Sequence, residues 1–490
     1  MKICVLPLDS RPCTYDFARD LAGISGLDIV MPPIDIMGNL LEPSDFSTIS
    51  QWLLANAINC NALVISIEQL LYGGLVASRQ SRITLAAAQE KLKILNGLKA
   101  ANPKLRIFAF NVLMRTTIST LSLESVVWWE AVGEYSKYAH LAQMEEENLE
   151  NKRVLRELEE KIPDTVLNEF LSVRERNHEI NKACIGLVNQ GIIDFLPIPQ
   201  EDCDEFGMHK AEQERLTELI DRYGLQQKVL LHNGTDEAVT ELLARAVSGS
   251  SVPICVKWLG YNQDFTALFE DRPFADNLES HLRTVNMHED EAADTVLFIY
   301  TPKSSQGDFC AISKETPVSG YSASETDYFA KEIADAAAQG KKCYILDVAF
   351  ANGGDIELLR SLAKYMDISD IYGYSAWNTA CNALGTILSQ IVLSDSQNTE
   401  KNKSFTYSRI LDDAIYQSII RQRLNNVLVE KGLDPWRITD LGLADKLLQH
   451  EFKMAKPIID EIITDCSFGF SAHLRWPRTF EIEILMKELG

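Results

Sequence analysis

The chain has 490 residues, too many for one ordinary hydrophobic core, so we expect two or three domains. Lysine and arginine total 47 against 70 aspartate and glutamate residues, and 47 − 70 gives a net charge of −23. This charge excludes nucleic acid and anionic membrane surfaces as partners, because both would repel the chain. The sequence has no run of about 18 apolar residues, so we expect no membrane-spanning helix. Its ten cysteines are scattered without a C-x-x-C pair, which predicts buried thiols of a cytoplasmic protein.

Short apolar, β-branched runs alternate with helical patterns, as in parallel α/β proteins. The run at residues 3–8 predicts a first strand and not a signal peptide, because Asp9 and Arg11 interrupt it at once. Nine more strands are predicted at residues 28–31, 62–67, 106–112, 192–198, 228–231, 253–258, 295–300, 343–348 and 370–374. Helical patterns cover residues 85–100, 211–222, 237–247 and 325–339. The sequence therefore predicts an α/β fold whose parallel-strand body is barrel-like or doubly wound.

Two regions depart from this alternation. Residues 121–189 are charged and helical in pattern, which predicts a helical insertion. Residues 394–403 are polar and predict a loop, after which the pattern is helical to the end. We therefore expect a main α/β domain over residues 1–290, a smaller α/β part over 291–400 that completes the pocket, and a helical C-terminal cap over 401–490.

Polar residues follow most of the predicted strands. Ligands of parallel α/β proteins gather at the carboxyl ends of the strands, so these residues predict a substrate pocket. The residues expected to bind substrate here are Asp9, Arg11, Glu68, Gly73, Gly74, Arg79, Asn111, Glu237, Asn352 and Asp355. Gly73 and Gly74 have a simpler alternative explanation, a turn, although two glycines also permit close approach of the backbone to a ligand.

Glu201 and Asp202 are the predicted acid–base pair. Such pairs work because burial or a like charge raises the pKa of one carboxyl group and leaves the other ionised. Consecutive residues point to opposite faces of a strand, so both enter one pocket only if the strand ends there. Asp236, after the next strand, is the third catalytic candidate. The alternatives are a solvated loop at Glu201 and Asp202, and an N-cap at Asp236 with Glu237 in the first helical turn.

A cluster of Trp377, Asn378 and Asn382 follows the last predicted strand and opens a helix. Asparagine amides can hydrogen-bond a polyol, an indole can cover a sugar ring, and backbone N–H groups at a helix start are free to bind a ligand. These three residues are therefore expected to bind substrate. The alternative is an asparagine N-cap beside a core tryptophan.

Other catalytic templates are missing from the sequence, which has no G-x-S-x-G elbow, no P-loop and no G-x-G-x-x-G after a strand. A divalent ion held by a group drawn from Asp9, Asp202, His209, His232 and Asp236 is an open alternative. No compact H-x-H or H-E-x-x-H pair supports it, so we expect neither a metal nor another cofactor.

Several segments together resemble one bacterial family. They are residues 8–12 (Leu-Asp-Ser-Arg-Pro), 72–79, 174–178, 200–202 with Gly207, 234–237, 377–379 with Asn382 and Gly385, and 476–481. These blocks are similar to those of the family catalogued as domain of unknown function 4127 (DUF4127), and they cover nearly the whole chain. The resemblance implies relatives but no reaction. The family's Gln-Asp-Asp block is Gln-Glu-Asp here, so the resemblance supports Asp202 better than Glu201.

A looser similarity points to sugars. Barrel hexosaminidases and hyaluronidase-like enzymes place adjacent carboxylates at one strand end and a Trp-Asn…Asn segment at a later one, which is an analogy at the level of the fold. We therefore predict a carbohydrate-active hydrolase for N-acetylhexosamine-type substrates, with Asp202 as acid/base and Glu201 or Asp236 as its partner. Arg11 and Arg79 would contact a polar or anionic substituent.

Two other classes stay open: a metal-dependent hydrolase of phosphate or amide bonds using Asp9, Asp202, Asp236 and His232, and a non-catalytic sugar-binding protein. The expected partner is a small molecule, and homo-oligomerisation is left open.

Overall fold

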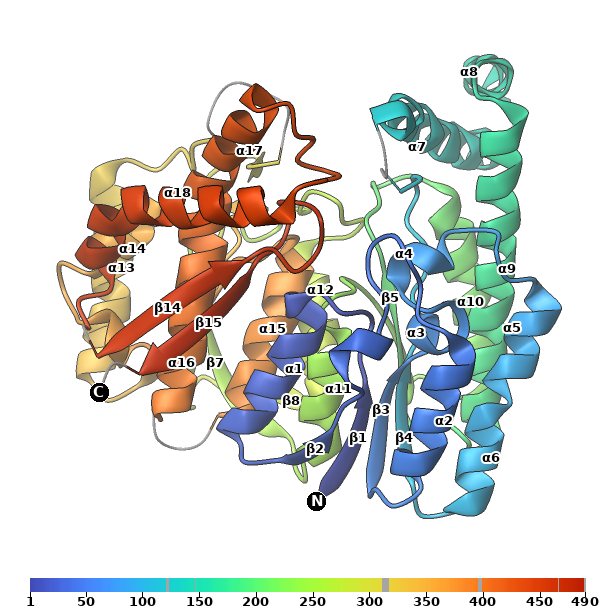
Figure 1. The fold of residues 1–490 in the computed structure, drawn as a ribbon, viewed down its shortest axis with the longest axis horizontal. Coiled ribbons are helices and arrows are strands. Elements are labelled where there is room, and N and C mark those ends of the chain that lie inside the picture. The colour runs from blue at the N-terminus through green and yellow to red at the C-terminus, as the bar shows by residue number, and fades with distance from the viewer. Residues whose placement is uncertain (120–122, 146, 311–316, 395–398, 466, 489–490) are drawn as a thin grey trace. The chain divides into compact units, whose positions relative to one another are not determined.

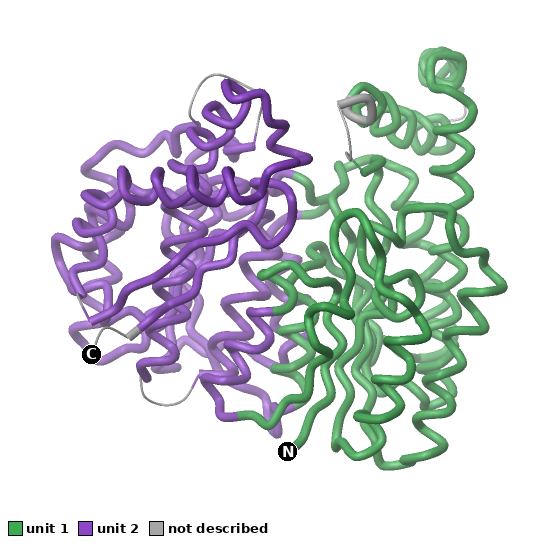
Figure 2. The backbone as a smooth tube through the Cα atoms, viewed as in Figure 1, with its two compact units in different colours: residues 1–15, 27–246, 269–272 green, residues 16–26, 247–268, 273–490 purple. Residues whose placement is uncertain are grey.

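The chain forms two compact units in a computed structural model that describes residues 1–119, 123–145, 147–310, 317–394, 399–465 and 467–488. Unit 1 comprises residues 1–15, 27–246 and 269–272, and unit 2 comprises residues 16–26, 247–268 and 273–490 (Figure 2). Residues 121–122 and 146 of the predicted insertion and 395–398 of the predicted loop lie outside the described residues. The three-part division of the chain stays a prediction.

Unit 1 is built on parallel strands (Figure 1). They are β1 (Lys2–Leu6), β2 (Asp28–Val30), β3 (Ala62–Ser66), β4 (Arg106–Phe110), β5 (Leu196–Gln200) and β6 (Val229–Asn233). The first four form a sheet in the order β2-β1-β3-β4, and β5 pairs in parallel with β6. Bridges between Phe108 and Phe195 and between Leu113 and Gln200 connect β4 with the β5 segment. All six strands predicted in this part of the sequence are confirmed.

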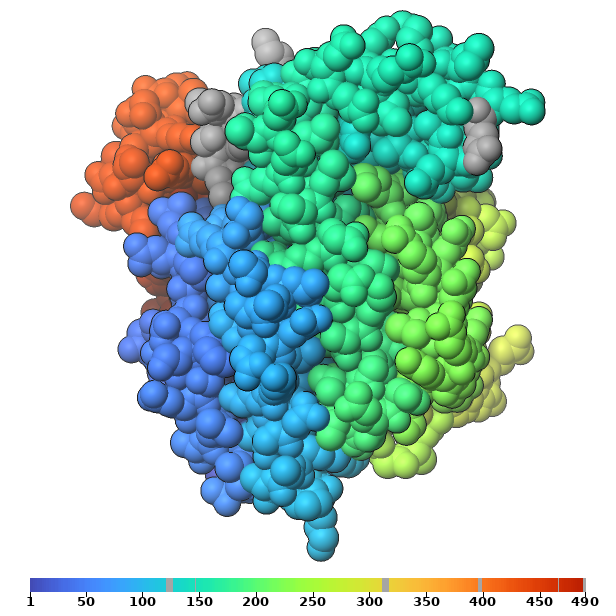
Figure 3. All heavy atoms as spheres, turned by 90° about the vertical axis from the view of Figure 1, so that its right-hand side faces the viewer, coloured from blue at the N-terminus to red at the C-terminus, as the bar shows by residue number. Residues whose placement is uncertain are grey.

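A layer of helices covers one face of these strands. Alternate strand residues, such as Cys4 and Leu6 in β1 and Leu63 and Ile65 in β3, point into one buried core with those helices. Figure 3 shows the helical layer from outside, running from blue through light blue to green. The helical elements of unit 1 up to the insertion are α1 (Pro12–Ile24, of which only the first turn belongs to unit 1), η1 (Ile34–Ile36), α2 (Phe46–Ala57), α3 (Ile67–Tyr72), α4 (Leu75–Ser78), α5 (Leu85–Leu92) and α6 (Ile94–Ala101).

The predicted helix over residues 85–100 is in fact two helices. Lys93 ends α5 and begins α6, and its N–H donates to Glu90 in a tighter i to i+3 turn. The described part of the predicted helical insertion contains α7 (Leu123–Met144), α8 (Leu149–Lys161) and α9 (Asp164–Asn189), which pack around a small core that also includes Met114. The remaining helices of unit 1 are α10 (Met208–Tyr223) and α11 (Ala238–Val247).

Unit 2 carries a second parallel sheet, in the order β13-β11-β9-β7-β8. Its strands are β7 (Val252–Leu259), β8 (Met287–Glu289), β9 (Thr295–Tyr300), β11 (Lys342–Asp347) and β13 (Gly373–Ser375), and a short pair joins β10 (Gly307–Asp308) to β12 (Phe350–Ala351). The four strands predicted here are confirmed, whereas the sequence analysis missed the short strands β8, β10 and β12. The helices are α12 (Phe274–Val285), α13 (Ala323–Ala338), α14 (Ile356–Leu362), η2 (Ile368–Asp370), α15 (Ala380–Leu393), α16 (Glu400–Arg409), the π-helix η3 (Ile410–Ile420), α17 (Arg421–Glu430) and α18 (Leu441–Ile462).

The prediction of helix to the C-terminal end is wrong. An antiparallel hairpin of β14 (Phe468–His473) and β15 (Glu483–Glu488) follows α18. Pro477, between the two strands, cannot donate a helical hydrogen bond. Ile484 and Met486 pack against the core of unit 2 while Leu485 is exposed, which is the two-residue period of a strand.

The structure therefore confirms an α/β fold with parallel sheets. Among the described residues, no helix combines the length and apolar character needed to cross a membrane.

Candidate functional site

Arg11 joins the segments that follow the first and last strands of unit 1. Its Nε donates to Asp9 Oδ1 and Oδ2 at 3.0 and 2.9 Å. Its two terminal nitrogens lie 2.9 and 2.7 Å from the two carboxylate oxygens of Asp236, which is a bidentate pair. All three side chains are buried. The structure thus brings Asp9, Arg11 and Asp236 together and commits both carboxylates to one guanidinium.

Glu201 and Asp202 lie at the end of β5, each beside an arginine. Glu201 forms an ion pair with Arg79, whose Nε is 3.2 Å from Oε2, and Asp202 Oδ2 lies 2.6 Å from Arg115 Nη2. Arg115 Nη1 is also 3.9 Å from Glu201 Oε1, so one guanidinium faces both carboxylates. The Glu201 side chain is 5% exposed and that of Asp202 is 33% exposed. The two neighbouring carboxylates therefore have different environments, as an acid–base pair requires.

Glu68 follows β3 and is held by neutral donors. Asn111 Nδ2 lies 2.6 Å and the Val112 N–H nitrogen 2.7 Å from Glu68 Oε1, and Ser66 Oγ donates to Oε2 at 3.2 Å. Burial raises the pKa of Glu68 to about 7, although these hydrogen bonds oppose the shift. The structure therefore places a carboxyl group that can exchange a proton near neutral pH at the end of β3.

Gly73 and Gly74 connect α3 to α4. Gly73 ends α3 with φ 86°, and a Cβ there would lie 2.6 Å from the Ser44 carbonyl oxygen. Gly74 has φ 131°, and a Cβ there would lie 3.7 Å from Asp9 Cβ. Gly73 thus has the structural role of a helix C-cap against a crowded backbone, while Gly74 lies beside the Asp9 segment.

The predicted residues of unit 2 form a group of their own. The Asn352 N–H donates to the Asn378 carbonyl at 2.7 Å, and both residues have positive φ, 60° and 58°. Trp377 is 2% exposed, and its ring packs edge-on against Phe480 with the centroids 5.5 Å apart. The core interpretation of Trp377 is therefore confirmed. The N-cap interpretation of Asn378 is wrong, because Thr379 occupies that position.

Asp347 and Asp355 lie beside this group, at the end of β11. Asp347 Oδ2 accepts hydrogen bonds from the Asp355 N–H at 2.6 Å and the Tyr374 hydroxyl at 3.0 Å. Burial and then the nearby Asp355 raise the pKa of Asp347 to about 7. Asp355 caps α14 by accepting from the Glu357 N–H at 3.0 Å, and Asn382 is buried in the first turns of α15. Asp347 and Asp355 are therefore held by backbone N–H groups and, for Asp347, by the Tyr374 hydroxyl.

Among the described residues of unit 1, two groups offer three potential metal ligands each: Cys203, His209 and Asp271, and His232, Glu237 and Glu241. The residues of the predicted metal alternative do not form one ligand set. Asp9 and Asp236 hold Arg11, and Asp202 holds Arg115.

Asp271, in the first group, is already surrounded by donors. His209 Nε2, Lys210 Nζ and Gln213 Nε2 lie 3.1, 2.8 and 2.9 Å from its Oδ2. Burial alone would raise the pKa of Asp271, but the bond to His209 and the cations Arg272 and Lys210 hold it well below its usual value. The negative charge of Asp271 is therefore already balanced by neighbouring cations and hydrogen-bond donors.

A hollow of about 480 Å³ lies among α7, α9 and α10 of unit 1. Arg174 and Glu212, two charged residues in its lining, form a buried ion pair at 2.7 Å. Arg174 and Glu212 thus neutralise each other within the lining.

The sequence pattern of a family described as Protein of unknown function (DUF4127) matches residues 3–485. The chain belongs to the DUF4127 family. No curated protein and no solved structure matches the chain. Membership confirms the resemblance found in the sequence blocks and assigns no reaction, so the function of this family member has to be argued from the site.

Sequence reasoning missed three parts of these arrangements. Arg115 was identified as a polar residue after the fourth predicted strand, but its pairing with both Glu201 and Asp202 was not foreseen. Glu241 follows Glu237 by four residues, a spacing that places both on one face of a helix. Asp271 is about 60 residues from His209 and Lys210 along the chain, and no spacing rule relates them.

Proposed function

We propose that unit 1 of this DUF4127 protein is a carbohydrate-active hydrolase in which Asp202 is the acid/base and Glu201 its carboxylate partner. The observation that carries the proposal is Arg115, which faces both carboxylates while only Asp202 reaches solvent. Hydrolysis by paired carboxylates needs one group that exchanges a proton with the substrate and one that stays ionised. Arg79 forms an ion pair with Glu201 and so places a positive charge directly against that carboxylate.

Asp236 is the weaker partner candidate. It is buried, and Arg11 binds both of its oxygens. A carboxylate fixed in this way has no free oxygen edge to offer a substrate, whereas Asp202 has one oxygen on Arg115 and a third of its side chain exposed. We therefore assign Asp236 to positioning Arg11.

We also infer that unit 1 is doubly wound and not a barrel, which the strand order supports. In the order β2-β1-β3-β4 the second strand lies on one side of β1 and the third on the other. Ligands of such sheets bind outside the carboxyl ends, where the direction of winding switches. Asp9 and Gly74, which belong to the segments after β1 and β3, lie beside each other at this switch point.

Turnover of a panel of chromogenic substrates tests the reaction class. We expect hydrolysis of aryl N-acetylhexosaminides or related glycosides, and no hydrolysis of aryl phosphates or amides. Activity should survive exhaustive dialysis against a chelator. A protein that cleaves only phosphates or amides, or that needs an added divalent ion to cleave anything, contradicts the proposal.

Metal-dependent hydrolysis of phosphate or amide bonds is the second candidate. The observation that favours it is the group of His232, Glu237 and Glu241, which offers one nitrogen and two carboxylate ligands. The same panel separates the two classes, because only this one loses its activity with the chelator and regains it with a divalent ion.

A further inference from the structure

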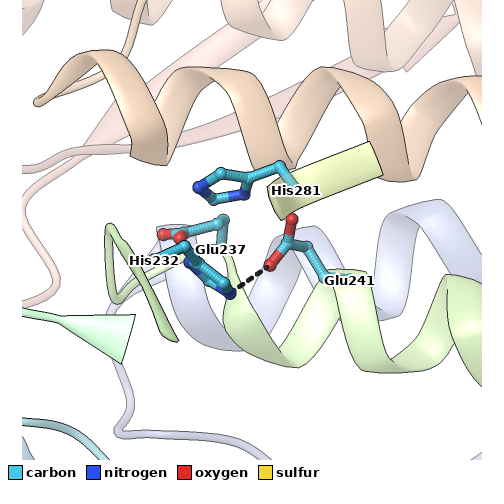
Figure 4. Close-up of side chains that lie close together, drawn as sticks. All are labelled: His232, Glu237, Glu241 and His281. Atoms are coloured by element: carbon cyan, nitrogen blue, oxygen red, sulfur yellow. Dashed lines mark ion pairs between the residues drawn. The ribbon is translucent and has the colours of Figure 1, made fainter. Parts of the chain in front are cut away.

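His232, Glu237 and Glu241 form a buried cluster at the end of β6 and the start of α11. The two glutamates are four residues apart, so they share one face of the helical segment, and His232 projects from the strand end (Figure 4). Exposure is at most 1% for each residue. One donor atom from each lies within 4.8 Å of those of the other two, a separation that small side-chain shifts can close around an ion.

The hydrogen bond of the imidazole indicates which nitrogen faces the carboxylates. His232 Nδ1 lies 2.8 Å from the backbone carbonyl of Asn233, an acceptor, so Nδ1 carries the proton. Nε2 then presents its lone pair, and it lies 3.9 Å from Glu241 Oε2, too far for a hydrogen bond. An imidazole whose Nδ1–H is bound to a carbonyl is the usual arrangement of a metal-binding histidine.

Glu237 supplies an independent observation that points to a ligand. Its Oε2 accepts from the Thr235 N–H at 2.8 Å, while its Oε1 is buried and has no hydrogen-bond partner among the described residues. A buried carboxylate oxygen without a partner is costly. Gly234 makes room for this oxygen, because a Cβ at its φ of 103° would collide with Oε1.

The carboxyl groups of Glu237 and Glu241 lie close enough to repel each other when both are ionised. Burial and the nearby Glu241 raise the pKa of Glu237 well above its usual value. Burial likewise raises the pKa of Glu241 to about 7, and His232 opposes that shift. A bound cation would stabilise both ionised groups.

We propose that His232, Glu237 and Glu241 bind a divalent first-row transition-metal ion such as Zn²⁺ or Mn²⁺. One imidazole nitrogen with carboxylate oxygens suits these ions, whereas Ca²⁺ and Mg²⁺ prefer ligand sets made of oxygen alone. The group of Cys203, His209 and Asp271 is a poorer host, because an ion there would have to displace Lys210 from Asp271. The site is independent of the reaction assigned to Asp202.

Metal binding by the full chain tests the site directly. The purified protein is stripped with a chelator, and binding of Zn²⁺, Mn²⁺ and Ca²⁺ is measured by equilibrium dialysis with elemental analysis. We expect about one equivalent of Zn²⁺ or Mn²⁺ per chain, no comparable Ca²⁺ binding, and a higher melting temperature with the bound ion. Absence of binding to the wild-type chain overturns the proposal.

Variants locate the ion. Glu241→Gln and Glu237→Gln keep the side-chain volume and should weaken binding by about tenfold or more, and His232→Ala should do the same. Cys203→Ser, in the other cluster, and Glu214→Gln, on the outer side of α10, are the matched controls and should bind as the wild type does. Melting temperatures of the metal-free variants show whether each one folds. Loss of binding in Cys203→Ser, or full binding in both glutamine variants, assigns the ion elsewhere and contradicts the proposal.

Discussion

The two units carry parallel sheets with corresponding strand orders, but they hold the carboxylates at their strand ends by different means. Unit 1 has the order β2-β1-β3-β4 and unit 2 the order β8-β7-β9-β11, so in each the first strand lies between the second and the third. In unit 1 the strand-end carboxylates Asp9, Glu201, Asp202 and Asp236 all pair with arginines. In unit 2 Asp347 is held by the Tyr374 hydroxyl and by backbone N–H groups.

This difference decides the chemistry available at each sheet edge. A guanidinium stabilises the charged carboxylate, so the strand ends of unit 1 can keep a base ionised. Neutral donors do not outweigh burial, which raises the pKa of Asp347 to about 7 and favours its protonated form at lower pH. The strand topology therefore sets where each carboxyl group lies, and its burial and neighbouring side chains influence whether it is ionised. Glu68, Glu237 and Glu241 are carboxyl groups of unit 1 that resemble the unit 2 pattern, because burial raises the pKa of each.

Removal of a buried arginine from unit 1 should give the largest loss of stability. Arg79→Ala leaves Glu201 buried without its closest cation, so we expect the free energy of unfolding to fall by about 3–5 kcal/mol in urea titrations. Tyr374→Phe removes one neutral hydrogen bond in unit 2 and should cost about 1 kcal/mol. Arg82→Ala, at an exposed position three residues away, is the control for Arg79. If Arg79→Ala and Tyr374→Phe lowered the free energy of unfolding by the same amount, the proposed difference between the two units would be contradicted.

Asp347 should make stability fall as the pH rises. The folded protein keeps this proton up to about pH 7, whereas the unfolded chain loses it near the ordinary pKa of 3.8. The folded state thus binds more protons between these values, and the contribution of the group to stability is complete below about pH 4 and lost by about pH 7.

Asp347→Asn should therefore flatten the pH dependence of unfolding by about 2–4 kcal/mol between pH 4 and pH 7. The measurement is the difference between the wild-type and variant free energies of unfolding at a series of pH values. Asp370→Asn, at an exposed position before β13, is the control and should keep the wild-type slope. A constant difference across the range would show that Asp347 is ionised in the folded protein and would contradict the prediction.

Asn378 should give a small effect, similar in size to that of Tyr374→Phe, because its constraint lies in the backbone. It has φ 58°, a conformation that a residue with a Cβ adopts at a cost and that asparagine tolerates better than alanine. We expect Asn378→Ala to lower the unfolding free energy of unit 2 by about 1 kcal/mol and Asn378→Gly to change it by less. If Asn378→Gly is less stable than Asn378→Ala, the contribution of Asn378 to stability comes from its side chain and not from its backbone conformation.

The parts of the fold that depend on local pattern could be predicted from the sequence. Buried parallel strands appear as continuous apolar runs, and each of the ten predicted strands is present. The polar residues after them were identifiable for the same reason, since a run that ends in Asp9 or in Glu201 and Asp202 marks a strand end. The hairpin of β14 and β15 was missed because its strands are only partly buried and lack such a run.

Pairing between strand ends could not be predicted. Arg11 reaches Asp236 across 225 residues and Arg79 reaches Glu201 across 122 residues, so no local spacing links them. Trp377 shows a different limit. The polar residues around it suggested that its ring is exposed and covers a sugar, but the ring is packed inside unit 2. Burial depends on which elements cover a segment, and a segment's own residues do not encode this.

The central claim is that Asp202 exchanges a proton with the substrate, and turnover of Asp202→Asn tests it most directly. Asp204→Asn is the matched control, because Asp204 lies two residues away at an exposed position. Asp202→Asn should lower kcat on a cleaved glycoside by roughly 10²–10⁴-fold. It should barely move the melting temperature, since a partly exposed ion pair contributes about 0–1 kcal/mol. Wild-type turnover in Asp202→Asn, or the same loss in Asp204→Asn, would contradict the account.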